Sequence, residues 1–201
     1  VPKADNLVCY RHLRRQTLTA AAAPFALGLC RPARYQCATA PPWPQPRPNI
    51  MPPADLLARA VRHHEAGQLA QAERLYLKVL KRQPSQPDAL HLLGVIAHQQ
   101  GRHPEAVERI EAAIEANPRV AAFHYNLGLA RRALGRPDAV AAFAAALELD
   151  PGHRDAAFEK ASTEAELGDL AAAIAGFERL LAAGPHGPAQ ANLAQALRQT
   201  G

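Results

Sequence analysis

Histidines are the residues of this 201-residue chain whose chemistry first suggests a site. His64, His91 and His98 lie in segments with helical periodicity, and the last two are seven residues apart, on one face of a helix. Two helical turns separate that pair by about 10 Å, too far to share an ion. No carboxylate or cysteine completes a ligand set. We therefore expect these histidines to contact solvent or a peptide, and we expect no metal site.

Other reactive residues follow no catalytic pattern. The sequence has no phosphate-binding loop, nucleophile elbow or paired-cysteine motif, and His64-Glu65 lacks the second histidine of a zinc-protease motif. Cys9, Cys30 and Cys37 are 21 and 7 residues apart, a spacing that fits neither a disulfide framework nor a zinc site. We expect no enzymatic activity and no cofactor.

The positive charge is confined to one end of the chain. Residues 1–50 contain seven lysines and arginines against Asp5, a net charge of +6, whereas the whole chain carries +5. The rest is therefore almost neutral, which argues against a nucleic-acid partner. Hydrophobic residues make up 48% but aromatic residues only 5%. Together with the abundant alanine, this composition favours closely packed helices over a sheet.

Residues 1–52 do not have the composition of a folded domain. Seven prolines between positions 41 and 53 predict an extended chain. Met51, the single methionine, stands directly before the first expected helix. We expect residues 1–52 to be a disordered leader or an upstream extension of a protein that starts at Met51.

A targeting signal is the alternative for this segment. Basic residues 11–15 precede an apolar run over 18–30, as in an export signal, but Pro24 interrupts the run. The run is also too short to span a bilayer. We expect a cytoplasmic protein without a membrane span, or an exported protein if residues 1–40 act as a signal; an organellar presequence is a further alternative.

Two ladders of residues repeat along the remaining chain. Glycines recur at spacings of 34, 34, 33 and 33 residues, at Gly67, Gly101, Gly135, Gly168 and Gly201. A proline follows an alanine by twelve residues in each of four repeats, with a large residue four positions after the alanine. The alanine, large residue and proline are Ala72, Tyr76 and Pro84; Ala106, Ile110 and Pro118; Ala139, Phe143 and Pro151; and Ala173, Phe177 and Pro185.

This period predicts one helical hairpin per repeat. The first four ladder glycines end the first helix of each hairpin, and the prolines stop the second. Gly94 and Gly128 lie inside first helices, where small residues allow the second helix to approach, and we expect Ala106 and Ala139 to face them. A leucine at position 94 would overpack the hairpin by roughly 1–3 kcal/mol. The large ladder residues fill the seams between neighbouring hairpins.

The segments Leu90-x2-Leu93-Gly94 and Leu127-Gly128, with the two ladders, resemble the tetratricopeptide repeat. The resemblance covers residues 53–201, with complete repeats at about 53–86, 87–120, 121–153 and 154–186 and a first or capping helix at 187–201. It implies an all-α, right-handed α-solenoid. Repeat position four, where the family often has tryptophan, holds Leu56, Leu90, His124 and Ala157.

The resemblance also implies a concave groove lined by the first helices, which binds a peptide. On each first helix, the side chains next to the face that packs on the second helix form a stripe that we expect to face the groove. This stripe supplies the candidate peptide-binding residues, namely His91, Val95, His98, Tyr125, Asn126, Leu129, Arg132, Phe158, Asn192 and Gln195. Alternatively, Val95 and Leu129 pack between adjacent first helices.

Asn126 and Asn192 occupy the same repeat position. They resemble the asparagine ladder in the repeat domain of O-linked N-acetylglucosamine transferases, whose amides contact a peptide backbone. The ladder is incomplete here, because Ala58, Leu92 and Glu159 stand at the equivalent positions. A solvated surface amide is the alternative for each asparagine.

These features predict a scaffold that binds a protein or peptide. Leu57 and Val61 replace the lysine and asparagine with which related repeats clamp chaperone C-termini, so no chaperone clamp is expected. The alternative is the N-terminal substrate-recognition part of a larger glycosyltransferase or sulfotransferase, whose catalytic domain is not in this chain. A third hypothesis, an assembly factor for an envelope complex, depends on export.

Overall fold

The structure is a computed structural model that describes residues 52–200. The expectations for the leader, the export signal, the start at Met51 and the three cysteines lie outside the described residues. Within residues 52–200 the chain forms nine helices and no strand. The predicted all-α fold is therefore confirmed.

The helices are short and of similar length. Their bounds are α2 (Pro53–Glu65), α3 (Leu69–Leu80), α4 (Pro87–Gln99), α5 (His103–Ala116), α6 (Ala121–Ala133), α7 (Ala139–Leu149), α8 (Arg154–Glu166), α9 (Leu170–Ala182) and α10 (Gly187–Thr200). Proline stands in the first turn of α2, α4 and α5, where its missing N–H would have no helical partner in any case. No helix among residues 52–200 is both long and apolar enough to cross a membrane.

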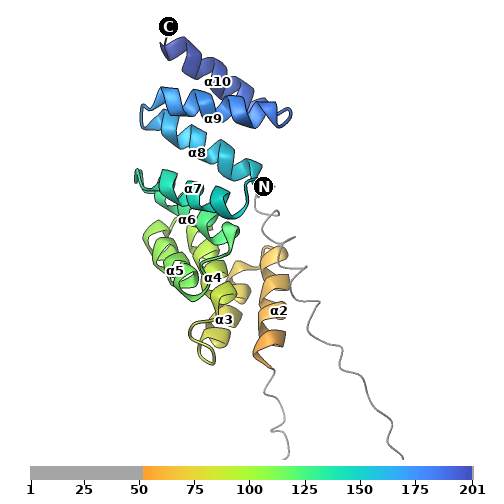
Figure 1. Cartoon of the computed structure of the whole chain (residues 1–201). Coiled ribbons are helices and arrows are strands. Elements are labelled where there is room, and N and C mark those ends of the chain that lie inside the picture. Colours follow the sequence, from red (N-terminus) through yellow and green to blue (C-terminus); the bar gives the residue numbers. More distant parts are fainter. Residues whose placement is uncertain (1–51, 201) are drawn as a thin grey trace, which may run out of the picture. The chain divides into compact units, whose positions relative to one another are not determined.

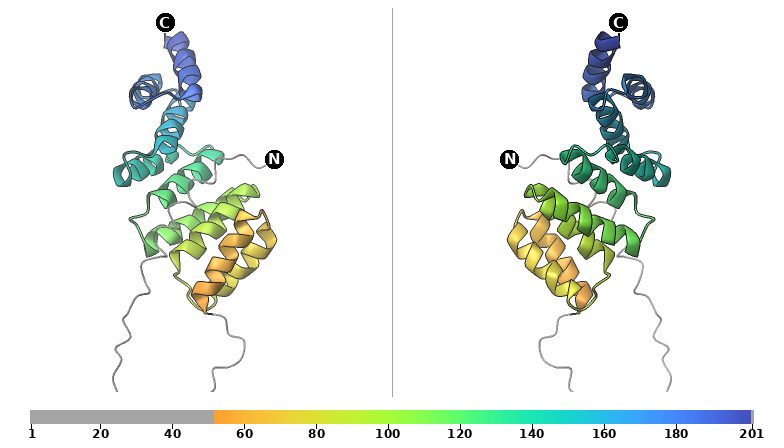
Figure 2. Two further views of the ribbon diagram at one scale, coloured as in Figure 1. Left: turned by 90° about the vertical axis from the view of Figure 1, so that its right-hand side faces the viewer. Right: turned by 90° about the vertical axis from the view of Figure 1, so that its left-hand side faces the viewer.

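The helices pack as successive antiparallel pairs. Even-numbered helices are the first helices and odd-numbered helices the second helices of each pair, and every helix contacts its neighbours in sequence. First helices also contact across pairs, α4 with α6, α6 with α8 and α8 with α10. Figures 1 and 2 show the pairs following one another from α2–α3 to α10. This arrangement is a right-handed α-solenoid, as predicted.

The turn inside each pair depends on a left-handed glycine. Gly101, for example, has φ +78°, and its N–H donates to the His98 carbonyl at 3.0 Å while the Arg102 N–H donates to the Ala97 carbonyl at 2.8 Å. These two bonds form a Schellman motif, which satisfies carbonyls at the end of α4. The same motif recurs at Gly67, Gly135 and Gly168, which also have positive φ. The prediction that these glycines end the first helices is confirmed.

Glycines inside the first helices mark close helix–helix contacts. A Cβ at Gly94 would lie 2.5 Å from Ile110 Cγ1 and 3.1 Å from the Ala106 carbonyl oxygen. At Gly128 a Cβ would lie 2.5 to 2.8 Å from the Phe143 ring. The close approach is confirmed, and the nearest atoms at Gly128 are those of the Phe143 ring. That Ala139 faces Gly128 stays a prediction. Phe143 lies one helical turn beyond Ala139, and its ring covers the glycine.

In the fourth pair the two helices also approach closely, but the glycine lies on the second helix and the alanine on the first. Ala161 on α8 stands at the repeat position of Gly94 and Gly128, and Gly176 on α9 faces it. A Cβ at Gly176 would lie 2.9 Å from the Ala161 Cβ. Close packing is therefore kept, with the glycine on the second helix.

The large ladder residues form the core. Tyr76, Ile110, Phe143 and Phe177 are 0% exposed. Ile110 packs in one cluster with residues of α4 and of the next first helix, including Phe123. The clusters around Phe143 and Phe177 likewise join three successive helices. The prediction that these residues fill the seams between hairpins is confirmed for Ile110, Phe143 and Phe177.

Candidate functional site

The ten candidate residues differ in burial. His91, Val95, Tyr125 and Asn126 are buried, Gln195 is exposed, and the others, His98, Leu129, Arg132, Phe158 and Asn192, are half-buried. They come from α4, α6, α8 and α10, each of which contacts the next first helix.

His91 and Asn126 form a polar pair between α4 and α6. The Asn126 Nδ2 group lies 2.9 Å from His91 Nε2 and donates to the Ala122 carbonyl at 2.9 Å. Burial lowers the pKa of His91 to about 3, so its ring is neutral at pH 7. Since the amide donates to Nε2, the imidazole proton is assigned to Nδ1. The N–H groups of Asn126 are thus engaged inside the array.

Two aromatic rings of the candidate stripe are stacked against histidines. The Tyr125 ring centroid lies 4.8 Å from that of His153, and the Phe158 centroid lies 4.9 Å from that of His186. Nδ1 of His153 accepts from the Ala156 N–H at 3.2 Å, and Nδ1 of His186 accepts in the same way at the start of α10. Each imidazole therefore caps a first helix and covers the aromatic ring of the preceding one.

These two histidines were not among the predicted site residues. His153 and His186 are 33 residues apart, the period of the third and fourth repeats, and each directly precedes a first helix. This recurrence is a signal that could have identified them.

Arg132 on α6 is bound to two carboxylates of α8. Its Nε donates to Glu166 Oε2 at 3.0 Å, and its terminal nitrogens form ion pairs with Glu159 and Glu166. The hydrogen bond from Arg132 lowers the pKa of Glu166, whereas burial raises the pKa of Glu159 despite the nearby arginine. With both glutamates ionised, the three groups carry one net negative charge.

Further along the stripe, polar side chains contact one another. His98 Nδ1 lies 3.2 Å from His103 Nδ1, and burial, followed by the His103 ring, lowers the pKa of His98. Asn192 donates to Ser162 Oγ at 3.3 Å, linking α10 to α8. Among residues 52–200 no group of three or more histidine, cysteine, aspartate or glutamate side chains is placed to hold a metal ion.

Solved structures share this fold at low sequence identity. MamA is 23% identical with a TM-score of 0.66, covering 70% of this chain and 84% of that chain. YrrB, described as "a TPR protein with an unusual peptide-binding site", is also 23% identical with a TM-score of 0.66, covering 72% and 76%. Comparison with curated protein sequences gave no match.

A third similar structure belongs to an enzyme. An O-GlcNAc transferase mutant from Thermobaculum terrenum is 27% identical over 64% of this chain, with a TM-score of 0.60. The matched region covers only 25% of that chain.

The family comparison covers most of the described helices. The profile of the family described as "Tetratricopeptide repeat" matches residues 57–109, 100–139 and 136–188. The matched residues make up more than half of the chain and include the glycine turns and the seam residues. The chain therefore belongs to the tetratricopeptide-repeat family.

Proposed function

We propose that this chain is a protein-interaction scaffold that binds an extended segment of a partner protein across its first helices. The site is the candidate stripe. Its buried members hold the first helices in place, namely the pair His91–Asn126 and the Tyr125 ring. The half-buried members of the stripe contact the partner.

One observation carries the proposal: half-buried side chains of the stripe lie on four consecutive first helices, and we take them as one row. His98 lies on α4, Leu129 on α6, Phe158 on α8 and Asn192 on α10, and each of these helices contacts the next. Such a row offers apolar contacts at Leu129 and Phe158 between hydrogen-bonding groups at His98 and Asn192, which suits an extended peptide.

The charge of this row favours a neutral or basic segment. Arg132 is neutralised by Glu159 and Glu166, which leaves one negative charge in excess. The lowered pKa of His98 keeps that ring uncharged at pH 7. Charge complementarity mainly sets specificity and association rate, so acidic peptides should bind more slowly and more weakly.

Tetratricopeptide-repeat relatives support this use of the fold. The printed description of YrrB assigns it a peptide-binding site, and its helices superpose on this array with a TM-score of 0.66. The proposal transfers only the class of ligand, a peptide, because 23% identity establishes the shared fold alone.

The test is selection of peptides from a random display library, followed by affinity measurement with fluorescence anisotropy. We expect at least one neutral or basic peptide with a Kd below about 1 mM. Phe158→Ala should weaken it about tenfold. Leu77→Ala removes a leucine that is 39% exposed on α3, outside the row, and should leave the Kd unchanged.

Circular dichroism melting of each variant separates loss of contact from loss of fold. Two results would overturn the proposal: no saturable peptide, or equal affinity for the wild type and a folded Phe158→Ala variant.

A second candidate function rests on the likeness to the Thermobaculum terrenum enzyme. At 27% identity over part of its length, that protein shows the same repeats in a much longer chain. The repeats of this chain would then present protein substrates to a glycosyltransferase or sulfotransferase domain. Intact mass spectrometry of the endogenous protein tests this: a mass tens of kilodaltons above 21.6 kDa supports it, and a mass at or below that value rejects it.

A further inference from the structure

We propose that two copies of this chain associate through their second helices, with the outer face of α3 in one copy against the outer face of α5 in the other. No member of the candidate stripe lies on α3 or α5, since the stripe belongs to the first helices. The proposal is therefore independent of the groove.

The outer face of α3 is basic. Arg74, Lys78 and Lys81 follow one another at spacings of four and three residues, which places them on one side of the helix. All three are exposed, and Lys81 is the C-cap residue of α3. We call these three residues the basic face. Residues 69–82 contain four lysines and arginines against Glu73, a net charge of +3.

The outer face of α5 is acidic. Glu108 and Glu115 are exposed and lie seven residues apart, two turns along one side of the helix. We call this pair the acidic face. Residues 103–116 contain four glutamates against Arg109, a net charge of −3 with His103 counted as neutral.

The two faces occupy the same repeat positions. Arg74 and Glu108 are 34 residues apart, and so are Lys81 and Glu115. This is also the spacing of the seam residues of α3 and α5, so each of these cations has a glutamate at the same height on the next second helix. The later second helices lack this pattern, because the equivalent positions hold Ala141 and Glu148 on α7 and Ala175 and Ala182 on α9.

The charges of the two faces are unpaired within one copy. None of the five residues forms an ion pair among residues 52–200. The neighbouring charges are already engaged: Glu73 and Glu105 pair with Arg102, Arg109 pairs with Glu105 at 3.6 Å, and Glu111 pairs with Arg131 at 2.8 Å. The two faces are therefore available to a partner.

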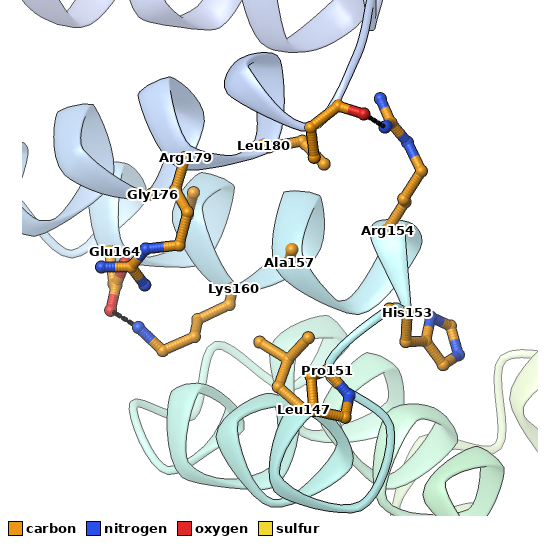
Figure 3. Close-up of a pocket in the computed structure, with 13 residues that line it drawn as sticks. Leu147, Pro151, His153, Arg154, Ala157, Lys160, Glu164, Gly176, Arg179 and Leu180 are labelled. Carbon is orange, nitrogen blue, oxygen red and sulfur yellow. Dashed lines mark hydrogen bonds and ion pairs between the residues drawn. The ribbon is translucent and has the colours of Figure 1, made fainter.

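Elsewhere in the array, cations are engaged by the chain itself. A cavity of about 330 Å³ lies between α7, α8 and α9, with Ala157 in its lining. Two of its three lysines and arginines have partners (Figure 3): Lys160 pairs with Glu164, and Arg154 donates to the Ala183 carbonyl at 3.1 Å. The basic face differs, because none of its three cations is paired in this way.

An exposed leucine lies beside the basic face. A hollow of about 510 Å³ is lined by Leu77 and Leu80 of α3, by the basic face and by Arg109 of α5. Leu77 is 39% exposed. Because Arg109 is paired with Glu105, it adds no unpaired charge to the hollow. A partner laid across α3 and α5 would cover Leu77 as well as the charges.

Twofold symmetry would satisfy both faces at once. Successive second helices run in the same direction, so a twofold axis parallel to them and midway between α3 and α5 lays α3 of one copy over α5 of the other. Arg74 then faces Glu108 of the second copy, and Lys81 faces Glu115 of the second copy. The same two pairs recur by symmetry, so the contact closes as a dimer.

Charge complementarity selects a second copy as the occupant. An unrelated acidic protein would cover the basic face and leave Glu108 and Glu115 unpaired, and a basic protein would do the reverse. Two copies placed with α3 against α3 would bring like charges together, which opposes that register. Exposed ion pairs each contribute little, so the dimer is weak and sensitive to salt.

The test is sedimentation equilibrium of the full chain between about 10 and 500 µM in about 20 mM sodium chloride, where screening is weak. We expect a monomer–dimer equilibrium with a Kd of about 100 µM, weakened at least about tenfold in 500 mM salt. A monomer at every concentration, or a dimer whose Kd does not change with salt, overturns the proposal.

Two double variants distinguish this contact from any other. Arg74→Glu with Lys81→Glu makes both faces acidic, and Glu108→Lys with Glu115→Lys makes both basic, so each variant alone should be monomeric. Mixed in equal amounts, the two should form a heterodimer, because opposite charges again face each other. Circular dichroism checks that both are folded, and no heterodimer between folded variants would overturn the proposal.

Glu148→Lys is the matched control. Glu148 is an exposed glutamate of α7 at the repeat position of Glu115, and its reversal should leave the dimer Kd unchanged. Residues 1–50, with a net charge of +6, are another possible partner for the acidic face. Association through them would survive the double reversal at Arg74 and Lys81, and that result would overturn the α3–α5 contact.

Discussion

The second and fourth helical pairs have the same arrangement of helices but bury different side chains. In α4 nine consecutive residues from Ala89 to Ala97 are buried, and seven of the nine are apolar side chains other than glycine and histidine. In α8 the buried residues are Ala156 and the run from Ala161 to Glu164, which includes a serine, a threonine and a glutamate. The buried residues of α4 are mainly apolar, whereas those of α8 are partly polar, and a cavity lies between α7, α8 and α9.

The repeat pattern therefore determines where the helices lie, but it does not determine whether the side chains buried in each pair are apolar or polar. Leu90 and Gly94 in α4 correspond to Ala157 and Ala161 in α8. Both pairs keep close contact between their helices, one through Gly94 and the other through Gly176. At position four the second pair has the buried side chain of Leu90, whereas the fourth pair has Ala157 in the lining of a cavity.

Acidic pH should destabilise the first two helical pairs more than the fourth pair. Burial lowers the pKa of His64 to about 4 and that of His91 to about 3, from an ordinary value of 6.5. The unfolded chain takes up protons below about pH 6.5 while these folded rings stay neutral, so stability falls as pH decreases. Between pH 7 and 4.5 we expect a loss of about 2 kcal/mol for each histidine.

Urea unfolding at several pH values, followed by circular dichroism, measures this loss. His91→Leu should be less stable at pH 7, because the Asn126 amide loses one of its acceptors, but should show a shallower decline in stability towards pH 4.5. A decline as steep as that of the wild type would show that His91 does not contribute.

Replacing Leu90 of the second pair by alanine, the residue that the fourth pair has at the same repeat position, should be strongly destabilising. Leu90→Ala removes a side chain that is only 8% exposed and leaves a cavity among Ile110, Phe123 and Leu127. We expect the free energy of unfolding to fall by about 3 kcal/mol. Chemical denaturation measures it, and a loss below about 1 kcal/mol would mean that α4 can collapse around the gap.

The close contact at Gly94 should tolerate no added methyl group. A Cβ there lies 2.5 Å from Ile110 Cγ1, so Gly94→Ala forces the isoleucine to move. We expect a net loss of about 1 kcal/mol, since overpacking exceeds the helix-propensity gain. Gly187→Ala is the control, because a Cβ at that position meets no atom within 4 Å; a Gly94→Ala variant as stable as this control would contradict the prediction.

The reverse conversion should be mildly stabilising. Ala157→Leu fills part of the cavity between Leu147 and Leu180, and cavity filling commonly adds about 1 kcal/mol. Thermal melting measures the change. A lower melting temperature would mean that the cavity is shaped too narrowly for leucine at this position.

The fold was largely predictable because its signals are local and periodic. The glycine and proline ladders determine where helices end, and Ile110, Phe143 and Phe177 were correctly predicted as seam residues. At Gly128 the spacing of Ala139 indicates a close helix–helix contact but not that the Phe143 ring occupies the space.

The site was less predictable because it depends on contacts between repeats. Periodicity placed Tyr125 and Asn126 on the stripe, but their burial depends on residues elsewhere in the chain, such as His91 and His153. Similarly, the sequence predicts Arg132 as a positively charged residue of the groove. In the structure Glu159 and Glu166 on the next first helix form ion pairs with it. The stripe remains a prediction for peptide binding.

The bridge from Arg132 to α8 also has a mechanical consequence. In a linear array each pair is held only by its neighbours, so the array opens at its weakest junction. The junction between the third and fourth pairs includes the cavity at Ala157 and the ion pairs of Arg132 with Glu159 and Glu166. Added salt weakens these partly exposed ion pairs and leaves the apolar seams intact, so we expect higher ionic strength to increase the flexibility of the solenoid at this junction.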